Sequence, residues 1–177
     1  MPTETQQTYT DNRIEKKILL RVPKTRVWRA ITDPKEFGSW FGLEVDGDFS
    51  PGSKVRGRIV PTKVDAEIAK QQSQHEGLSF ELTIDRIEPE RLFSFRWHPF
   101  AVDRQVDYTV EPTTLVSFEL QERHHGVMLT VTETGFDCLP AARRAEAFAA
   151  NEQGWAKQME LIEKYLTTFK TGFIEHM

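Results

Sequence analysis

The stretch EPTTLVSFELQERHHGVMLTVTETGF, residues 111–136, alternates apolar and polar side chains on both sides of a short turn. Strict alternation is typical of half-buried β-strands, because successive side chains of a strand point to opposite faces. The turn His124-His125-Gly126 joins the two halves as in a hairpin. The stretch therefore predicts two antiparallel strands. Their inward-facing positions are Val116, Phe118, Leu120, Val127, Leu129 and Val131.

Five shorter segments upstream show the same alternation and predict further strands. Turn-forming residues such as Asp46-Gly47-Asp48 and Ser50-Pro51-Gly52 lie between two of them. Short strands joined by such turns form an antiparallel meander. The predicted strands cover residues 14–22, 41–45, 55–59, 80–85 and 93–97, and a break at 98–114 precedes the hairpin.

Helices are predicted over residues 23–32, 33–38 and 140–170, each with a proline at or next to its first residue. The second is expected to end at Gly38. The third is long and amphipathic, and its apolar stripe must be covered by another element. Helices packed on one face of an antiparallel sheet make an α+β fold. The stripe consists of Phe148, Trp155, Met159, Ile162, Leu166 and Phe169.

The 177 residues suit one domain, which we place at 13–171 between a flexible N-terminal tail, 1–12, and a C-terminal tail, 172–177. Residues 61–77 are polar and rich in glutamine. We interpret them as a mobile loop that could contain one helical turn and could gate entry to a site.

Composition excludes several classes of protein. The net charge of −4, with no basic block, argues against nucleic-acid binding. No apolar run approaches the roughly 18 residues of a membrane span, and the first residues do not resemble a secretory signal. Cys138 is the single cysteine, which rules out an internal disulfide and a cysteine-rich zinc site. A cytoplasmic location is expected.

The order of these elements, with particular residues, resembles the START-like helix-grip (SRPBCC) superfamily of Bet v 1, polyketide cyclases and lipid-transfer domains. More narrowly, the chain resembles the C-terminal domain of the activator of Hsp90 ATPase, which bacteria carry as a stand-alone protein. The resemblance covers about residues 14–170. The matching stretches are IEKKILLRVPKTRVWRAITDPKEFGSWF (14–41), IDRIEPERLFSFRWHP (84–99), the hairpin stretch 111–136 and NEQGWAKQMELIEKYL (151–166).

The resemblance implies a curved antiparallel sheet of six to seven strands wrapped around the long C-terminal helix, with two short helices after the first strand and a cavity between sheet and helix. Members bind lipids, hormones, polyketides or other apolar molecules, and some are co-chaperones. No catalytic motif is shared among them, so the fold alone does not define the function. The N-terminal domain of the Hsp90 activator is not found in this chain, and a chaperone partner is therefore not expected.

We expect a binding cavity lined by aromatic and apolar side chains with two polar residues, His98 and Glu133, at its mouth. The alternative is that the same rings simply fill a core. The candidate ligand-binding residues are Phe41, Phe80, Phe93, Phe95, Trp97, His98, Phe118, Leu129, Val131, Glu133, Phe148, Trp155 and Met159.

The polar candidates each have two interpretations. His98 could act as a general base at a strand end, or it could cap the strand or bond a loop. Glu133 continues the inward face of its strand, where it could orient a polar ligand or anchor the structure. His124 and His125 are adjacent turn residues without a third ligand, so no metal site is predicted. We expect no cofactor and no catalytic residue.

The favoured function is binding of a small hydrophobic or aromatic ligand without catalysis. One alternative is a cyclase- or hydrolase-like enzyme acting on an apolar substrate through His98 or Glu133. A second is a co-chaperone-like module that binds a protein through its surface. A homodimer could form if the edge strand at 41–46 paired across a two-fold axis.

Overall fold

The computed structural model describes residues 12–175 and the side chains of residues 12–168. The N-terminal tail expected at 1–12 lies outside the described residues except for Asn12, whose Oδ1 accepts a hydrogen bond from the Asp137 N–H. The last two residues of the tail expected at 172–177 lie outside them too.

Seven antiparallel strands form one sheet in the order β1-β7-β6-β5-β4-β3-β2, so β1 and β2 are the edges. The predicted hairpin is confirmed: Val116 pairs with Glu133, and Phe118 with Val131. The strands are β1 Arg13–Leu20, β2 Leu43–Asp46, β3 Lys54–Ile59, β4 Ser79–Glu88, β5 Leu92–Trp97, β6 Thr114–Arg123 and β7 Gly126–Thr134.

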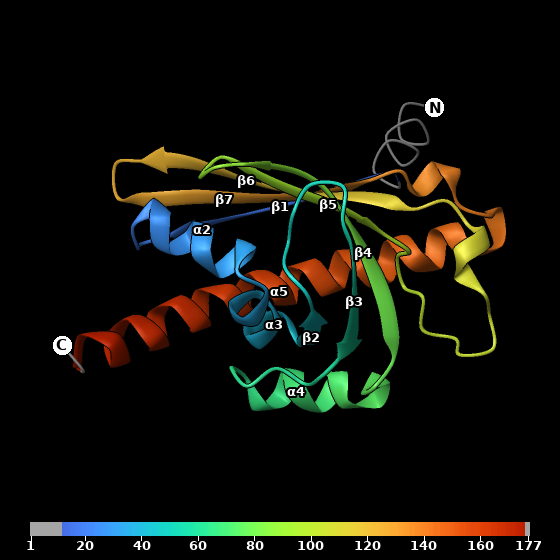
Figure 1. The fold of residues 1–177 in the computed structure, drawn as a ribbon, viewed down its shortest axis with the longest axis horizontal. Coiled ribbons are helices and arrows are strands. Elements are labelled where there is room, and N and C mark those ends of the chain that lie inside the picture. The colour runs from blue at the N-terminus through green and yellow to red at the C-terminus, as the bar shows by residue number, and fades with distance from the viewer. Residues whose placement is uncertain (1–11, 176–177) are drawn as a thin grey trace, which may run out of the picture.

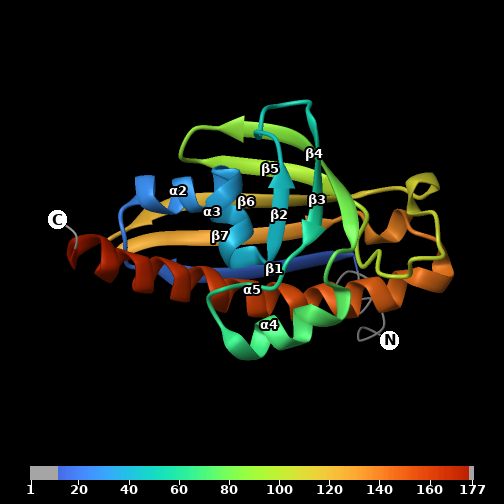
Figure 2. The same cartoon turned by 60° about the horizontal axis from the view of Figure 1, so that its bottom comes forward.

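The sheet curves around the long helix α5, Ala141–Glu175, which crosses its concave face (Figures 1 and 2). Two short helices, α2 Lys24–Thr32 and α3 Pro34–Phe41, follow β1. A fourth helix, α4 Ala66–Gln72, and three 3₁₀ turns complete the chain. This arrangement confirms the predicted α+β helix-grip fold. The 3₁₀ turns are η1 Ser73–His75, η2 Tyr108–Val110 and η3 Phe136–Cys138.

The sequence predicts that the second short helix ends at Gly38, but the helix continues to Phe41. A Cβ at Gly38 would lie 2.4 Å from the Leu43 carbonyl oxygen, so this glycine allows close backbone approach within a helix. The residue that caps its C-terminal end is Gly42, whose φ of 102° is the left-handed conformation that favours glycine. Phe41 is consequently a helical residue, and the strand begins at Leu43.

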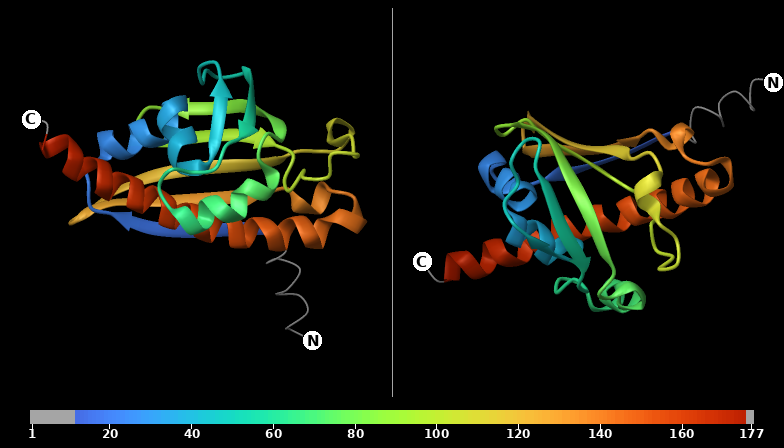
Figure 3. Two further views of the ribbon diagram at one scale, coloured as in Figure 1. Left: turned by 90° about the horizontal axis from the view of Figure 1, so that it is seen from below. Right: turned by 45° about the vertical axis from the view of Figure 1, so that its right-hand side comes forward.

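The prediction of a loop over residues 61–77 is wrong, because they contain α4 and η1. Their mobility stays a prediction. Asp65 caps α4 by accepting hydrogen bonds from the Glu67 and Ile68 N–H groups. No residue of α4 is fully buried. Two contacts of 2.6 Å, Lys164–Asp65 and Lys157–Gln71, join this helix and its cap to α5, and α4 crosses in front of α5 when the molecule is seen from below (Figure 3, left).

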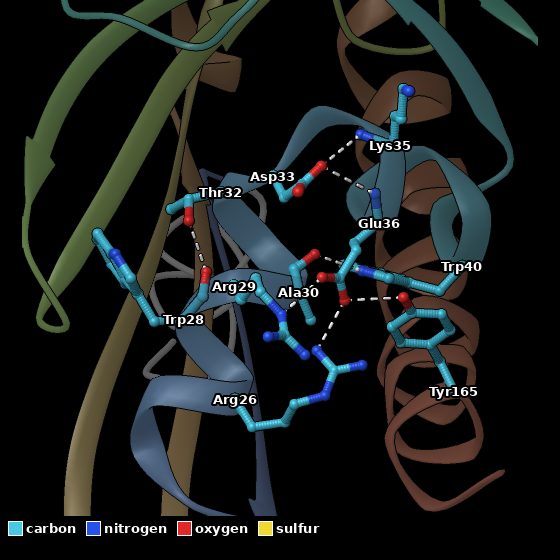
Figure 4. Close-up of polar contacts among 10 residues, drawn as sticks. All are labelled: Arg26, Trp28, Arg29, Ala30, Thr32, Asp33, Lys35, Glu36, Trp40 and Tyr165. Atoms are coloured by element: carbon cyan, nitrogen blue, oxygen red, sulfur yellow. Dashed lines mark hydrogen bonds and ion pairs between the residues drawn. The ribbon is translucent and has the colours of Figure 1, made fainter. Parts of the chain in front are cut away.

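A half-buried carboxylate, Glu36, connects α2 and α3 to α5 (Figure 4). Its oxygens lie 2.7 Å from Arg26 Nη1 and 2.8 Å from Arg29 Nε, and the Tyr165 hydroxyl donates to it at 2.8 Å. Burial, and then the bond to Glu36, raise the pKa of Tyr165 to about 12.

We expect the stability that Tyr165 confers over Tyr165→Phe to fall as pH rises from about 10 toward 12. The folded pKa lies above the ordinary value of 10.0, so in this range ionisation is open mainly to the unfolded chain. Urea unfolding of both proteins at about pH 8 and about pH 11 measures the difference. An equal difference at both pH values would contradict this role.

Candidate functional site

A fully buried carboxyl group, Glu133 on β7, has four side chains donating to it. Trp97 Nε1 and Thr114 Oγ1 donate to Oε2 at 2.7 and 2.6 Å. Trp155 Nε1 donates to Oε1 at 2.8 Å, and Asn151 Nδ2 reaches both oxygens at 2.9 and 3.2 Å. Indole N–H groups can only donate, so both carboxyl oxygens are acceptors here.

The fold brings these donors together from three different elements. Trp97 ends β5 and pairs with Thr114 at the start of β6, next to the β6–β7 pair that contains Glu133. Asn151 and Trp155 are four residues apart on α5 and therefore share one helix face. A fully satisfied buried network holds its members in one geometry, so Glu133 determines how both tryptophans are placed.

Beside this network lies a cavity of about 230 Å³. It is bounded by α5, the C-terminal end of α3, β3, β4, the segment around η1 and the start of the loop after β5. Trp97 and Trp155 lie 5.9 Å apart by ring centroid and form one wall. Among the predicted ligand-binding residues, the lining includes Phe41, Phe80, Trp97, His98 and Trp155.

Glu133 lies behind the cavity wall rather than at its mouth, and seven other predicted site residues are buried in the core away from the cavity. Other rings pack against several of them: the ring centroid of Phe37 of α3 lies 6.3 Å from that of Phe95 and 6.2 Å from that of Phe118, and Phe136 lies 5.2 Å from Phe148. The seven core residues are Phe93, Phe95, Phe118, Leu129, Val131, Phe148 and Met159.

His98 lines the cavity and contacts the loop after β5. Its Nε2 lies 3.1 Å from the Glu111 carbonyl oxygen, which is the loop-bonding contact expected in one of its two interpretations. A carbonyl can only accept, so Nε2 carries the proton and a neutral ring would leave Nδ1 as an acceptor.

The side chain of Arg143, at the start of α5, is only 19% exposed. It donates to the carbonyl oxygens of Pro99 and Phe100 and to Glu111 Oε1, at 2.9, 3.1 and 2.9 Å. Its guanidinium lies 4.7 Å from the Tyr108 ring centroid. Arg143 thus fastens the loop 98–113 to α5. Figure 2 shows this loop beside the start of α5, and the loop carries part of the cavity lining.

Among the lining residues that were not predicted, three lie on α5: Asn151, Gly154 and Gln158. They recur within two turns on the same face as Trp155, so the helical spacing was the available signal. Polar and glycine positions on an otherwise apolar stripe mark the part of the helix that faces the cavity.

The exposed turn residues His124 and His125 lie with their ring centroids 6.0 Å apart. Within residues 12–168, no group of three or more His, Cys, Asp and Glu side chains is arranged to hold a metal ion. In the described part of the chain, every helix is too short or too polar to cross a bilayer.

The sequence matches one family model over residues 21–167, that of the activator of Hsp90 ATPase homolog 1-like protein. No curated protein has significant sequence similarity to the chain.

Solved structures share the fold at low identity. The MLL2253 protein of Mesorhizobium loti is 20% identical with a TM-score of 0.64, over 88% of this chain and 97% of that one. The NE0264 protein of Nitrosomonas europaea is 18% identical with a TM-score of 0.65, over 91% and 97%. A protein from Arthrobacter aurescens is 15% identical with a TM-score of 0.68, over 89% and 87%.

Glu133→Leu should destabilise the protein more than Glu133→Gln, because it leaves two indole N–H groups and one amide without an acceptor. Each buried donor left unpaired costs about 1–3 kcal/mol. The glutamine variant keeps one carbonyl oxygen and donates to the Thr114 hydroxyl, so we expect about one such penalty. Urea unfolding measures both, with the exposed Glu119→Gln on β6 as control. Equal stability of all three variants would refute the anchoring role.

Arg143→Met should loosen the loop 98–113 while the sheet stays folded, since three hydrogen bonds and one cation–π contact are lost. Hydrogen exchange by mass spectrometry should show faster exchange over Phe100–Glu111 and unchanged protection in β6 and β7. The control is Arg123→Met at the exposed β6–β7 turn. Unaltered loop exchange in Arg143→Met would show that something else holds the loop.

Proposed function

The chain belongs to the family of activator of Hsp90 ATPase homolog 1-like proteins, and from this premise we propose that it binds a small hydrophobic or aromatic molecule without catalysis. The ligand would occupy the cavity between α5 and the sheet. The observation that carries the proposal is the set of aromatic side chains that line this cavity, which includes Phe41, Phe80, Trp97 and Trp155.

The size of the cavity supports a ligand of one or two rings. A dry apolar cavity of roughly 150 Å³ holds benzene, so about 230 Å³ accommodates somewhat more. Apolar walls with a few polar groups are the usual composition of small-molecule sites.

Gly154 keeps the cavity open. It lies on the cavity face of α5 one residue before Trp155, and a Cβ at this position would meet no atom within 4 Å. Glycine in a helix interior costs about 1 kcal/mol relative to alanine. That cost is consistent with a position that is kept empty for a ligand.

A binding role without catalysis is supported by the charges around the cavity. The lining, as far as the chain is described, contains no Asp, Glu, Lys or Arg. Both oxygens of Glu133, the nearby carboxyl group, already accept hydrogen bonds from protein donors. The surroundings therefore suit a neutral molecule held by packing.

Gly154→Leu should abolish binding of 2-naphthol, our test ligand, while leaving the melting temperature equal or higher. The leucine side chain fills the cavity and replaces a helical glycine, and both effects favour the folded state. Isothermal titration calorimetry and thermal unfolding measure these changes.

The matched control is Ala156→Leu, at an exposed position of the same helix, which should bind like the wild type. If 2-naphthol binds Gly154→Leu as tightly as the wild type, the ligand does not occupy this cavity.

A further inference from the structure

We propose that the binding site continues from the cavity through an opening in the sheet into a second, polar cleft. The ligand is then an aromatic or apolar group that carries a neutral, hydroxyl-bearing substituent. This inference deepens the proposed function and rests on it.

The sheet opens between β4 and the loop 98–113. Pairing of β4 with β5 begins at Thr83, which is opposite Arg96, so residues 79–82 have no partner in β5. Among the described residues, no backbone hydrogen bond joins 79–82 to the loop. The first residues of β4 therefore border an opening rather than a neighbouring strand.

The cavity and a second cleft meet at this opening. The cleft has a volume of about 540 Å³ and lies between the loop and the β3–β4 part of the sheet. Four residues line both spaces. Leu78 and Phe80 belong to the β4 side of the opening, and His98 and Ala101 belong to the loop side. A ligand that is longer than the cavity can therefore extend between these two sides into the cleft.

The other borders of the cavity are held by contacts that involve buried or half-buried groups. Gln158 of α5 donates to the Phe41 carbonyl oxygen of α3 at 3.0 Å, and Arg143 fastens the loop to α5. The opening is spanned by an exposed hydrogen bond of 3.2 Å, from Arg104 Nη2 to the Glu76 carbonyl oxygen. Exposed contacts of this kind are easily exchanged for water, so the opening is the border that a ligand crosses at the lowest cost.

The walls of the two spaces differ in charge. No Asp, Glu, Lys or Arg of the described chain lines the cavity. The cleft has two arginines and three carboxylates in its lining, which are Arg56, Glu81, Asp103, Arg104 and Asp107. Charges of both signs select neither an anion nor a cation, but together they can donate to and accept from hydroxyl groups. The cleft therefore suits a neutral substituent with hydroxyls.

The unpaired edge of β4 adds backbone donors and acceptors at the opening. The N–H and C=O groups of successive strand residues point alternately to the two sides of the strand. Those of Ile84 bond to Gly52 and Ser53 on the β3 side, so those of Ser79 and Glu81 point toward the loop. A hydroxyl group both donates and accepts, so it can pair with such an edge.

The test compares 2-naphthol with 2-naphthyl β-D-glucopyranoside, in which a sugar extends the same ring system. We expect the wild type to bind the glucoside about tenfold more tightly, the size expected for one net hydrogen bond gained. Isothermal titration calorimetry gives both dissociation constants, and this comparison needs no variant.

Glu81→Trp should remove this gain, because the indole occupies the cleft outside the cavity. 2-Naphthol, which fits within the cavity, should bind to this variant as it does to the wild type. The matched control is Glu119→Trp, an exposed glutamate of β6 that lines neither space, and this variant should keep the gain.

The outcomes separate this inference from the proposed function. If the wild type binds the glucoside no more tightly than 2-naphthol, or if the gain persists in Glu81→Trp, the inference is overturned and the cavity remains a binding site. Failure of the wild type to bind either probe overturns both. A gain that is lost in Glu81→Trp and kept in Glu119→Trp supports both.

Discussion

A carboxyl group with no exposed surface, Glu133, is the constraint on which this structure depends. Burying such a group is costly unless its oxygens are hydrogen-bonded. The chain meets this requirement with neutral donors from β5, β6 and α5, and no Lys, Arg or His of the described chain hydrogen-bonds to it. Because the donors sit on different elements, satisfying one residue positions the helix against the sheet and holds two indole rings.

The space between the sheet and α5 has two halves, which differ in the side chains that enter them. In one half, Phe37 from α3 packs onto Phe95 and Phe118 and completes a closed core. In the other half, Gly154 contributes no side chain, and Trp97 and Trp155 are held back by Glu133. The cavity follows from this difference. The loop fastened by Arg143 forms part of its lining without filling it.

Alternation and helical periodicity predicted most of the fold, because both depend on which residues face the core. The inward position of Glu133 followed from the parity of Val127, Leu129 and Val131. The anchoring role of Glu133, one of the two roles considered, could be settled only by knowing its partners, which come from segments 18 to 36 residues away.

The features that were not predicted either have little apolar pattern or depend on contacts that the pattern does not show. Asp65 is of a residue type that favours helix N-caps, but α4 has no buried residue. The sequence there consequently has little apolar periodicity from which a helix could be predicted. The helix stop at Gly42 was assigned to Gly38, because only the contact with Leu43 shows why a glycine is needed inside that helix. Likewise, alternation indicated which rings face inward, but the ring that fills the core, Phe37, comes from another element.

The central claim is that Glu133 holds Trp97 and Trp155 as one wall of a ligand cavity. The most direct test is to follow the indole N–H signals of all four tryptophans by ¹H–¹⁵N NMR, with and without 2-naphthol. The account predicts slow hydrogen exchange at Trp97 and Trp155 and ligand-induced shifts at both, with little change at Trp28 and Trp40. Rapid exchange at the two wall indoles, or shifts confined to Trp28 and Trp40, would contradict it.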